Sequence, residues 1–295
     1  AMSVIKAVVN KGGVVMHRFL RTPLIVIAFI FCVLFIPISL FADEFYDAAG
    51  FNPNRETFTM VPNEYIDTFT GGVILNFVDA RLPGNGGLDL VIQRTFNSKR
   101  VCKVWQSFGS SFSCKTVGDN SWMGLGWTMH FGRVINPYSS NPIIEMPDGS
   151  QHKLYAYIND STKRITRDYW LYEYYYDPTH PLYTGQYVVT FTDGRKIYFA
   201  HHGPQVDGKT TLYAIKMTDV NGNTINIYYK QPYASNEIID YIDDSVGRRI
   251  YFYTTTVNYD EKLTSISGPG VSFSYTYNGI SNWGYSFLVN ATQSV

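Results

Sequence analysis

The sequence has few cysteines, few charged residues and no excess of charge of either sign. Its 295 residues include three cysteines, too few for a small disulfide-stabilised protein. The 24 Lys and Arg residues balance the 24 Asp and Glu residues, and charged residues make up only 16% of the chain. A neutral chain that is 45% hydrophobic is neither an intrinsically disordered tail nor an electrostatic binder of nucleic acid. We therefore expect a folded protein with no nucleic-acid partner.

Helical periodicity is also missing after residue 42. The chain has instead 24 Tyr, 19 Phe and 24 Gly residues, with short runs in which aromatic or β-branched residues alternate with polar ones. Such residues favour strands, and glycine favours tight turns. The predicted fold class is all-β.

The zero net charge is an average over two unlike parts. Residues 1–42 carry four basic residues and no acid, which leaves 20 basic and 24 acidic residues, a net charge of −4, in the remainder. An uncharged run from Leu24 to Phe41 follows the basic residues, with Pro37 and the small Ala42 where a processing site needs them. We predict a signal peptide cleaved between Ala42 and Asp43, and hence a secreted or cell-surface protein. The alternative is an uncleaved anchor, because 18 such residues can span a bilayer. Membrane contact is expected only through this segment.

Export changes the interpretation of the cysteines, because disulfides persist in oxidising compartments. Cys32 lies inside the signal segment, so Cys102 and Cys114 are left as an even pair. We predict a disulfide between them, with two free or buried thiols as the alternative. Neither has a CxxC partner or a histidine at zinc-ligand spacing, so no metal site is expected there.

Short alternating runs separated by turn dipeptides indicate antiparallel hairpins. The clearest joins residues 187–192 to residues 195–199 through Asp193-Gly194. Asp-Gly is typical of a two-residue type I′ turn, in which both central residues take positive φ. Such a loop would set Val189 opposite Tyr198, with bulky apolar groups on both faces of the sheet.

The same pattern recurs four times, around Asp148-Gly149, Asn221-Gly222, Gly247 and, more weakly, Pro269-Gly270. The spacing between turn glycines shortens from 45 residues, between Gly149 and Gly194, to 28 and then 25. A regular spacing of this size indicates an array in which each hairpin buries its face on the next. After the signal segment we therefore predict three regions: a β region with a cysteine loop (43–135), irregular hairpins (136–205) and a repeat-like hairpin array (206–295).

Several segments resemble a known family. In chain order they are Leu82-Pro83-Gly84-Asn85-Gly86-Gly87-Leu88-Asp89-Leu90, Arg94-Thr95-Phe96-Asn97-Ser98, Gly124-Leu125-Gly126-Trp127-Thr128, residues 218–225 and residues 244–250. Together they resemble the N-terminal region of Rhs/YD-repeat proteins, which include wall-associated bacterial proteins, cocoon subunits of insecticidal toxin complexes and, distantly, teneurins. The last two segments resemble the family's Tyr-Asp-x-x-Gly-Arg repeats, although Tyr241 stands one residue too far from Gly247.

The resemblance implies a β-shell, or solenoid sheet, of stacked hairpins that encloses a toxin or effector polypeptide. The expected function is an exported, non-catalytic scaffold whose partners are a protein cargo or other subunits of the shell. The family's self-cleaving core and variable toxin tail have no counterpart in this sequence. We therefore expect either the first part of a longer protein or a short stand-alone member.

No catalytic pattern emerges, and we expect no enzyme activity, metal or cofactor. His201-His202 are neighbours, but adjacent residues of a strand face opposite sides. Asp219 to Asn223 begins like a calcium loop but lacks its closing Glu. Asp240, Asp243 and Asp244 would suit acid–base chemistry, but acids beside a turn are usually turn formers.

The richest aromatic cluster runs from Tyr169 to Tyr176. On an exposed edge its Trp170, Tyr172, Tyr174 and Tyr176 would form a surface for sugar rings or protein side chains. The same alternation suits a packed cross-strand ladder, which is the interpretation we favour. The alternative function is therefore a stand-alone secreted adhesion or carbohydrate-binding module with cell-surface glycans as partners.

Overall fold

A computed structural model describes residues 57–58, 63–67, 71–108, 111–117, 120–232, 235–257, 260–280 and 285–293. All of them belong to one compact unit, Ala49–Val295. These residues form β-strands and two 3₁₀ turns, η3 (Asn85–Gly87) and η4 (Ser98–Arg100), and none of them lies in an α-helix. The prediction of an all-β fold with antiparallel pairing is confirmed.

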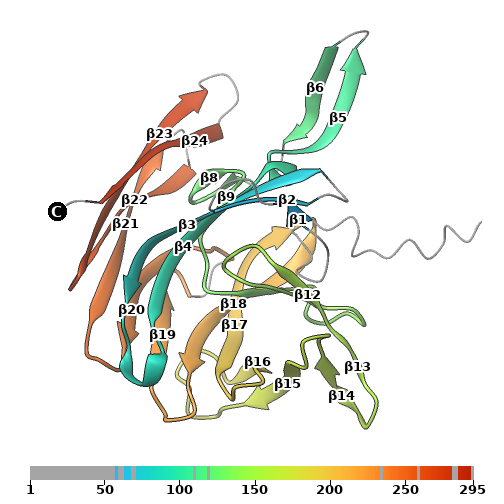
Figure 1. Ribbon diagram of the computed structural model, residues 1–295, viewed down its shortest axis with the longest axis vertical. Coiled ribbons are helices and arrows are strands. Elements are labelled where there is room, and N and C mark those ends of the chain that lie inside the picture. Colours follow the sequence, from blue (N-terminus) through green and yellow to red (C-terminus); the bar gives the residue numbers. More distant parts are fainter. Residues whose placement is uncertain are drawn as a thin grey trace, which may run out of the picture. The chain divides into compact units, whose positions relative to one another are not determined.

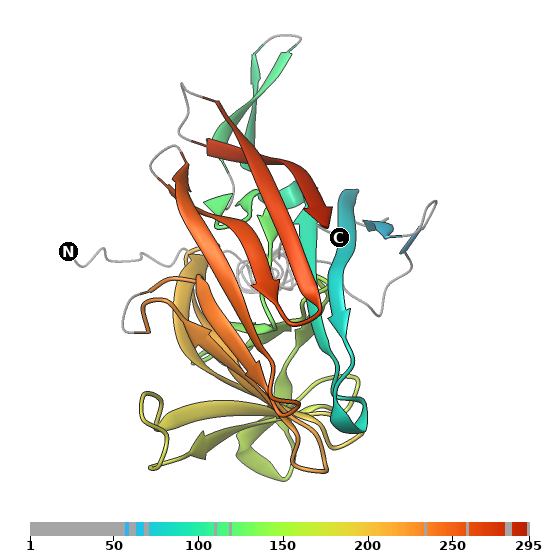
Figure 2. The same ribbon diagram turned by 90° about the vertical axis from the view of Figure 1, so that its left-hand side faces the viewer.

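A 15-stranded sheet makes up most of this unit (Figure 1). Twelve of its strands pair in chain order, and Figure 2 shows the last of them side by side in orange and red. They are β13 (Tyr155–Tyr157), β14 (Asp160–Ile165), β15 (Leu171–Tyr176), β16 (Gly185–Thr190), β17 (Lys196–Val206), β18 (Lys209–Thr218), β19 (Thr224–Tyr229), β20 (Ile239–Asp244), β21 (Arg249–Val257), β22 (Asp260–Gly268), β23 (Val271–Ile280) and β24 (Tyr285–Gln293). The other three, β10 (Arg133–Ile135), β11 (Ile143–Glu145) and β12 (Gln151–Lys153), join through the pairing of β10 with β18.

The remaining strands form three smaller sheets. Five strands pair in the order β1 (Thr57–Phe58), β2 (Glu64–Asp67), β3 (Gly72–Leu82), β4 (Leu90–Asn97) and β9 (Trp127–Thr128). Two isolated pairs are β5 (Cys102–Phe108) with β6 (Ser111–Val117), and β7 (Asn120–Ser121) with β8 (Gly124–Leu125).

Alternation along the strands gives the large sheet an apolar inner face. In β19, Ile225 and Ile227 are buried, whereas Asn226 is half-buried and Tyr228 is exposed. Successive side chains of a strand point to opposite faces, so the polar set lies on the outer face.

The core lies between this inner face and the β3–β4 hairpin, which Figure 1 shows alongside β19 and β20. Burying a Leu or Ile side chain contributes about 1.5–3 kcal/mol, so this contact holds the two sheets together. The cluster includes Leu82, Leu90 and Ile92 of the hairpin region and Ile225, Ile242, Ile250 and Ile266 of the large sheet.

The five hairpins expected from the sequence are all present, but the register of the clearest one differs by one residue. Val189 pairs with Ile197 and not with Tyr198. The reason is a three-residue loop: the Phe191 N–H donates to the Arg195 carbonyl (2.9 Å), and only Gly194 within the loop takes positive φ. This is a type I turn closed by a left-handed glycine, not a type I′ turn.

Three other loops use the same closure, over Met146–Ser150, Asp219–Asn223 and Asp244–Arg248. A two-residue Asp-Gly loop with both φ positive occurs instead at Asp207-Gly208, between Val206 and Lys209. Because this hairpin joins β17 to β18, the large sheet continues across the boundary that the sequence suggested near residue 205.

Candidate functional surfaces

Two turns of the large sheet share an Asp-x-x-Gly pattern and the same hydrogen bonds. Asp219 Oδ1 accepts from the backbone N–H groups of Asn221 (2.9 Å) and Asn223 (2.8 Å). Asp244 Oδ1 accepts from the N–H of Arg248 (3.0 Å), whose Nε donates to the second oxygen, Oδ2 (2.7 Å). Hydrogen bonds lower the pKa of Asp219, and the one from the side chain of Asn223 has the largest effect. Each carboxylate therefore serves the turn, which explains the repeat-like motif without a calcium ion.

The glycine-rich loop after β3 rests on both of these turns. Arg248 Nη2 donates to the carbonyl of Pro83 (2.8 Å). At Gly86, where φ is +62°, a Cβ atom would lie 2.6 Å from Asp219 Oδ2 and 2.9 Å from the side-chain nitrogen of Asn221. Segments that resemble one family but lie 133 residues (Gly86 and Asp219) and 165 residues (Pro83 and Arg248) apart therefore meet in space.

Gly86→Ala is expected to destabilise the fold by about 1–3 kcal/mol more than Gly87→Ala. Both glycines take positive φ, so both variants share the same kind of backbone strain, about 1–2 kcal/mol. Only at Gly86 would the added methyl group meet the Asp219 turn, because nothing lies within 4 Å of a Cβ at Gly87. Urea denaturation of the two variants measures the difference, and equal losses would contradict the contact.

The side chain of Arg94 joins two other segments that carry the family resemblance, residues 94–98 and 124–128. The Arg94 guanidinium lies over the rings of Phe77 (5.1 Å), Trp127 (5.5 Å) and Tyr275 (5.9 Å). Asp79 pairs with Arg94 (3.4 Å) and accepts a hydrogen bond from the Tyr275 hydroxyl (2.7 Å). Burial raises the pKa of Asp79, against the opposing effects of Tyr275 and Arg94. This cluster fastens the five-stranded sheet to β23.

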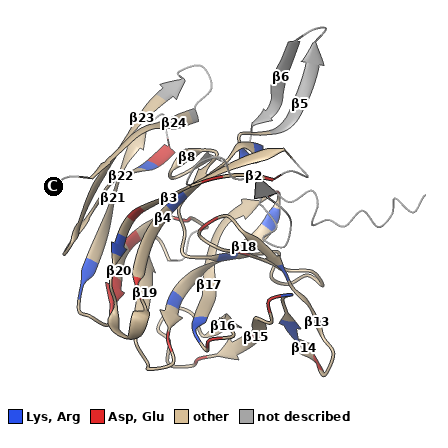
Figure 3. Cartoon of the chain, in the orientation of Figure 1, with Lys and Arg blue, Asp and Glu red and all other residues tan. Residues whose placement is uncertain are grey.

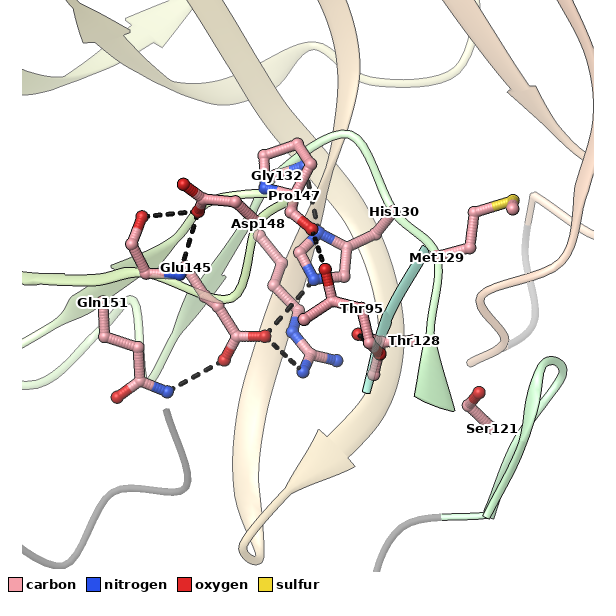
Figure 4. Close-up of polar contacts among 12 residues, drawn as sticks. Thr95, Ser121, Thr128, Met129, His130, Gly132, Glu145, Pro147, Asp148 and Gln151 are labelled. Atoms are coloured by element: carbon pink, nitrogen blue, oxygen red, sulfur yellow. Dashed lines mark hydrogen bonds and ion pairs between the residues drawn. The ribbon is translucent and has the colours of Figure 1, made fainter. Parts of the chain in front are cut away.

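A buried cluster of charged and polar side chains lies on one face of the paired strands β10, β11 and β12, and Figure 4 labels its members His130, Glu145 and Gln151. Glu145 Oε2 accepts from Arg100 Nη2 (2.5 Å) and Gln151 Nε2 (2.9 Å). Glu145 Oε1 accepts from Arg133 Nη2 (2.8 Å) and lies 3.3 Å from His130 Nε2. All five side chains are buried.

A second acid extends the cluster. Arg133 Nη1 donates to the Tyr213 hydroxyl (2.8 Å), which donates to Glu237 Oε2 (3.0 Å). Glu237 Oε1 accepts from the backbone N–H of Trp122 (2.9 Å). Two guanidinium groups are thus matched by two carboxylates, as buried charges require.

Burial and the neighbouring guanidinium groups shift the pKa values of Glu145 and His130. Burial by itself raises the pKa of Glu145, but Arg100 and Arg133 outweigh it and hold that pKa far below its ordinary value. Burial, and then the charge of Arg133, lowers the pKa of His130 to about 4, so this imidazole is neutral. Neither Glu145 nor His130 is therefore ready to exchange a proton near pH 7, and their buried contacts favour a structural role.

A family model described as a domain of unknown function (DUF6531) matches residues 63–154. The first three segments of the family resemblance, over residues 82–90, 94–98 and 124–128, lie inside this match. A search of curated proteins finds no match.

Solved structures with a similar fold include an effector domain and toxin-complex components. One is the N-terminal domain of effector protein SpvB from Salmonella typhimurium strain LT2 (TM-score 0.42, 11% identity, 74% of this chain and 99% of that chain). Another is TcdB2-TccC3 (TM-score 0.47, 9% identity, 83% and 16%), and a third is the Photorhabdus luminescens Tc holotoxin pore (TM-score 0.44, 11% identity, 83% and 16%). The chain thus spans about one sixth of the toxin-complex chains, and likenesses this distant carry no functional argument.

The structure separates the four residues of the predicted aromatic surface. Tyr172 is 3% exposed, and Trp170 is half-buried with its ring 4.1 Å from that of His152. Tyr174 and Tyr176 are 57% and 62% exposed. Of these four residues, Trp170 and Tyr172 are packed, and Tyr174 and Tyr176 are open to a ligand. A binding role for this segment stays a prediction.

A Ser-His-Asp arrangement that the sequence did not reveal lies beside Trp170. Ser150 Oγ is 3.3 Å from His152 Nε2, and His152 Nδ1 is 2.8 Å from Asp168 Oδ2. The Ser150 hydroxyl, however, donates to Asp148 Oδ1 (2.6 Å), and Ser150 is buried. A nucleophile must reach its substrate, so this serine is better explained as part of the Asp148 turn.

The other polar candidates lie apart. His201 is buried with its ring stacked 3.7 Å from that of Tyr229, whereas His202 is exposed. Asp243 is paired with Arg249 (2.6 Å). In the part of the chain that the structure describes, no group of three or more His, Cys, Asp or Glu residues is placed to hold a metal.

The predicted disulfide and the predicted signal cleavage site depend on residues that the structure does not describe. Cys102 begins β5 and is buried, and Cys114 lies in β6 opposite Trp105. The side chain of Cys114 lies outside the described residues, as do Ala42, Asp43 and the whole signal segment. The disulfide and the cleavage site therefore stay predictions. Among the helices of the described residues, none is long and apolar enough to cross a membrane.

The described strands also line two open pockets. One of about 300 Å³ lies between β4 and the β17–β18 pair, with Leu90, Phe131 and Met217 in its lining. Another of about 660 Å³ is lined by polar side chains such as Gln205 and Thr210. Neither lining includes Ser150 or a residue of the buried charge cluster, whereas the exposed His202 lines the larger pocket.

Proposed function

We propose that the protein is an exported, non-catalytic β scaffold of the Rhs/YD type, and that it forms part of a shell enclosing or presenting a toxin or effector polypeptide. The observation that supports this most is the large sheet itself. Twelve consecutive strands pair in chain order, with an apolar inner face along the array. A sheet built this way grows by adding hairpins, which is how a wall is extended.

The turns support the same proposal. The Asp219 and Asp244 turns are 25 residues apart and have the same carboxylate-capped geometry, so the array repeats a structural unit as well as a spacing. Each unit buries an isoleucine, Ile225 or Ile250, against the same core. Units that cannot bury their own apolar face need neighbours, which favours a continuing array over an isolated module.

The two ends of the large sheet differ in a way that suits extension in one direction. β13 has three residues and an irregular register, which is typical of a protected edge. β24 has nine residues, none of them charged, proline or glycine, and Val289 is 58% exposed. Ser286 and Leu288 of β24 lie beside Gly124 of β8, so the rest of this edge is the proposed template for a further strand.

The proposed partners are therefore a polypeptide cargo or other subunits of the shell, and the proposed location is outside the cell or at its surface. The signal segment predicted from the sequence supports this proposed location. The mildly acidic remainder of the chain, at −4, suits a soluble wall with no affinity for nucleic acid.

Protease protection of the full natural product tests the scaffold role. If a shell encloses the C-terminal polypeptide, added protease should leave that polypeptide intact, while the same polypeptide produced alone should be digested. A variant with Val289→Lys and Asn290→Pro should lose the protection, because it blocks pairing at the β24 edge. The matched control is Tyr174→Lys, which adds the same charge at another exposed strand position. A polypeptide digested as fast in the full product as alone would refute the enclosure.

A further inference from the structure

The smaller of the two pockets lies between the β3–β4 hairpin and the inner face of the large sheet. Residues of the hairpin, of the Met146-Pro147 turn and of β17, β18 and β19 line it. Its volume of about 300 Å³ is at the lower end of the range for small-molecule sites, about 300–1,000 Å³. The pocket is therefore of a size to hold a small ligand.

One wall of this pocket is a row of apolar side chains across three strands. Ile197 of β17 is directly opposite Met217 of β18, which is directly opposite Ile225 of β19. Directly opposite residues share a face, and Ile197 and Ile225 belong to the core on the inner face. Met217 is half-buried. The three side chains thus form a continuous apolar strip that the pocket leaves partly uncovered.

The facing wall comes from the β3–β4 hairpin and two turns. Val91 is directly opposite Arg81, so both side chains lie on the same face of the hairpin. Val91, Met146 and Phe191 are half-buried, and the last two pack against the core. Methionine has three rotatable bonds and fills irregular gaps, so Met146 and Met217 let the walls adapt to a ligand.

The charged residues of the lining are mostly cationic. Arg81, Arg195 and Lys196 line the pocket, whereas Asp89 is the one acid among the described residues that do so. All three cationic residues are exposed, and Lys and Arg residues are blue in Figure 3. The Arg195 guanidinium lies 5.9 Å over the ring of Phe191, so it stands directly beside the apolar wall.

These cations are available to a ligand. Arg195 is paired with Asp193 (2.6 Å) and Arg81 with Asp89 (3.3 Å), but both arginine side chains are more than half exposed. Exposed ion pairs contribute little to stability, so a ligand carboxylate can compete with them. Within the part of the chain that the structure describes, no ion pair or hydrogen bond engages the ammonium group of Lys196.

We propose that this pocket binds a small amphiphilic anion, a molecule with an apolar body and one carboxylate. The apolar body would cover the strip formed by Ile197, Met217 and Ile225, which releases water from apolar surface. The carboxylate would accept charge-assisted hydrogen bonds from Arg195 and Lys196 at the rim. A cationic amphiphile would meet like charges, and a ligand with many polar groups would leave them unpaired against the apolar walls.

This binding role goes beyond the scaffold role and does not depend on it, because every residue that lines the pocket belongs to one compact unit of this chain. A shell wall without affinity for the anion, and an anion-binding module without cargo, are distinguishable outcomes.

Calorimetric titration of the whole protein with octanoate, 1-octanol and octylamine tests the proposal. We expect saturable binding of octanoate with a Kd below about 1 mM, at least about tenfold tighter than the binding of octylamine. Arg195→Gln with Lys196→Gln should remove most of this preference and change the binding of 1-octanol by no more than about twofold. Lys163→Gln with Arg164→Gln is the matched control, since it removes the same charge from β14, outside the lining.

A second pair of variants tests whether the ligand occupies the pocket. Val91→Trp should weaken the binding of octanoate and 1-octanol at least about tenfold, because the larger side chain fills the space between the walls. Val246→Trp is its control, since Val246 is 46% exposed and lies outside the lining. Circular dichroism and the melting temperature show whether each variant is folded. Should Val91→Trp unfold, the variant of the exposed Arg195 and Lys196 still decides the question.

Three results would each overturn the proposal. The first is no saturable binding of octanoate, as expected if an apolar side chain of the same chain already fills the pocket. The second is equal binding of octanoate and octylamine, which would show that the rim does not select an anion. The third is an equal loss of octanoate binding in Val91→Trp and Val246→Trp, or in the two charge variants.

Discussion

Replacing Glu145 with Gln is expected to lower the free energy of unfolding by about 3–5 kcal/mol, because it leaves two buried guanidinium groups without the carboxylate between them. Arg100 and Arg133 approach the two oxygens of Glu145 to 2.5 and 2.8 Å, and all three side chains are buried. An amide keeps the shape of the side chain but not its charge. Since folded proteins are stable by only about 5–15 kcal/mol, such a variant should be partly unfolded near physiological temperature.

The measurement is urea denaturation at pH 7, followed by tryptophan fluorescence. Glu173→Gln is the control, since Glu173 is a half-exposed partner of Lys163 (3.1 Å), and such surface pairs contribute at most about 1 kcal/mol. A loss as small as this from Glu145→Gln would show that water, and not the carboxylate, solvates the two arginines.

The buried charge cluster could be only partly predicted from the sequence. Glu145 follows Ile143 and Ile144 in a strand that is otherwise apolar, and an acid in such a run is almost always paired. This pattern predicts that Glu145 is paired, but it does not predict which residues pair with it. Arg133 and Arg100 lie 12 and 45 residues away, and only the pairing of β10 with β11 and the position of η4 bring them to it.

The hairpins were predictable, but one register was not. Asp193-Gly194 and Asp207-Gly208 are the same dipeptide, yet the first lies in a three-residue loop and the second forms a two-residue one. The decisive factor is the burial of the flanking strands. In the observed register Val189 and Ile197, both buried, face each other on the inner side. A one-residue slip would move one of them to the outer face, so tertiary packing overrides the turn preference of the dipeptide.

The aromatic segment from Tyr169 to Tyr176 shows a second limit of prediction from the sequence. Alternation correctly predicts that Tyr172 and Tyr174 lie on one face of β15, and both contact the ring of Tyr187, at 5.1 and 5.5 Å. Yet Tyr172 is buried and Tyr174 is exposed. Periodicity predicts which face a residue lies on, but not how far the next layer covers that face. That coverage depends on residues distant in the sequence.

Acidification from pH 6.5 to pH 4 is expected to destabilise the fold through two buried histidines. Burial, followed by the charge of Arg133, lowers the pKa of His130 to about 4. Burial also lowers the pKa of His201 to about 4, with a further contribution from the charge of His202 and against its hydrogen bond to the Asn236 carbonyl. In the unfolded chain each imidazole has a pKa of about 6.5. Between these values the unfolded state binds protons that the folded state excludes, so stability falls as pH falls.

The loss amounts to at most about 1.4 kcal/mol per pH unit for each histidine, or roughly 3 kcal/mol each over the window. Glu145 adds to the loss only toward the lower end of the window, because its pKa in the folded protein is far lower than its ordinary value of 4.5, at which the unfolded chain begins to bind its proton. Above pH 6.5 the slope from this source should decline, and it should vanish about one pH unit higher, where both histidines are neutral in both states.

Urea denaturation at half-unit intervals from pH 7.5 to pH 4 should show this slope (about 2–3 kcal/mol per pH unit near the middle of the window). His130→Gln with His201→Gln should flatten it, although the variant is less stable at pH 7 because glutamine fills neither site as well as imidazole. Subtracting the two curves cancels the groups common to both, including Asp79, whose pKa burial raises. His202→Gln, which alters an exposed neighbour, should keep most of the slope. If the double variant kept the full slope, other groups would have to take up the protons, and the neutral state of His130 beside Glu145 would be wrong.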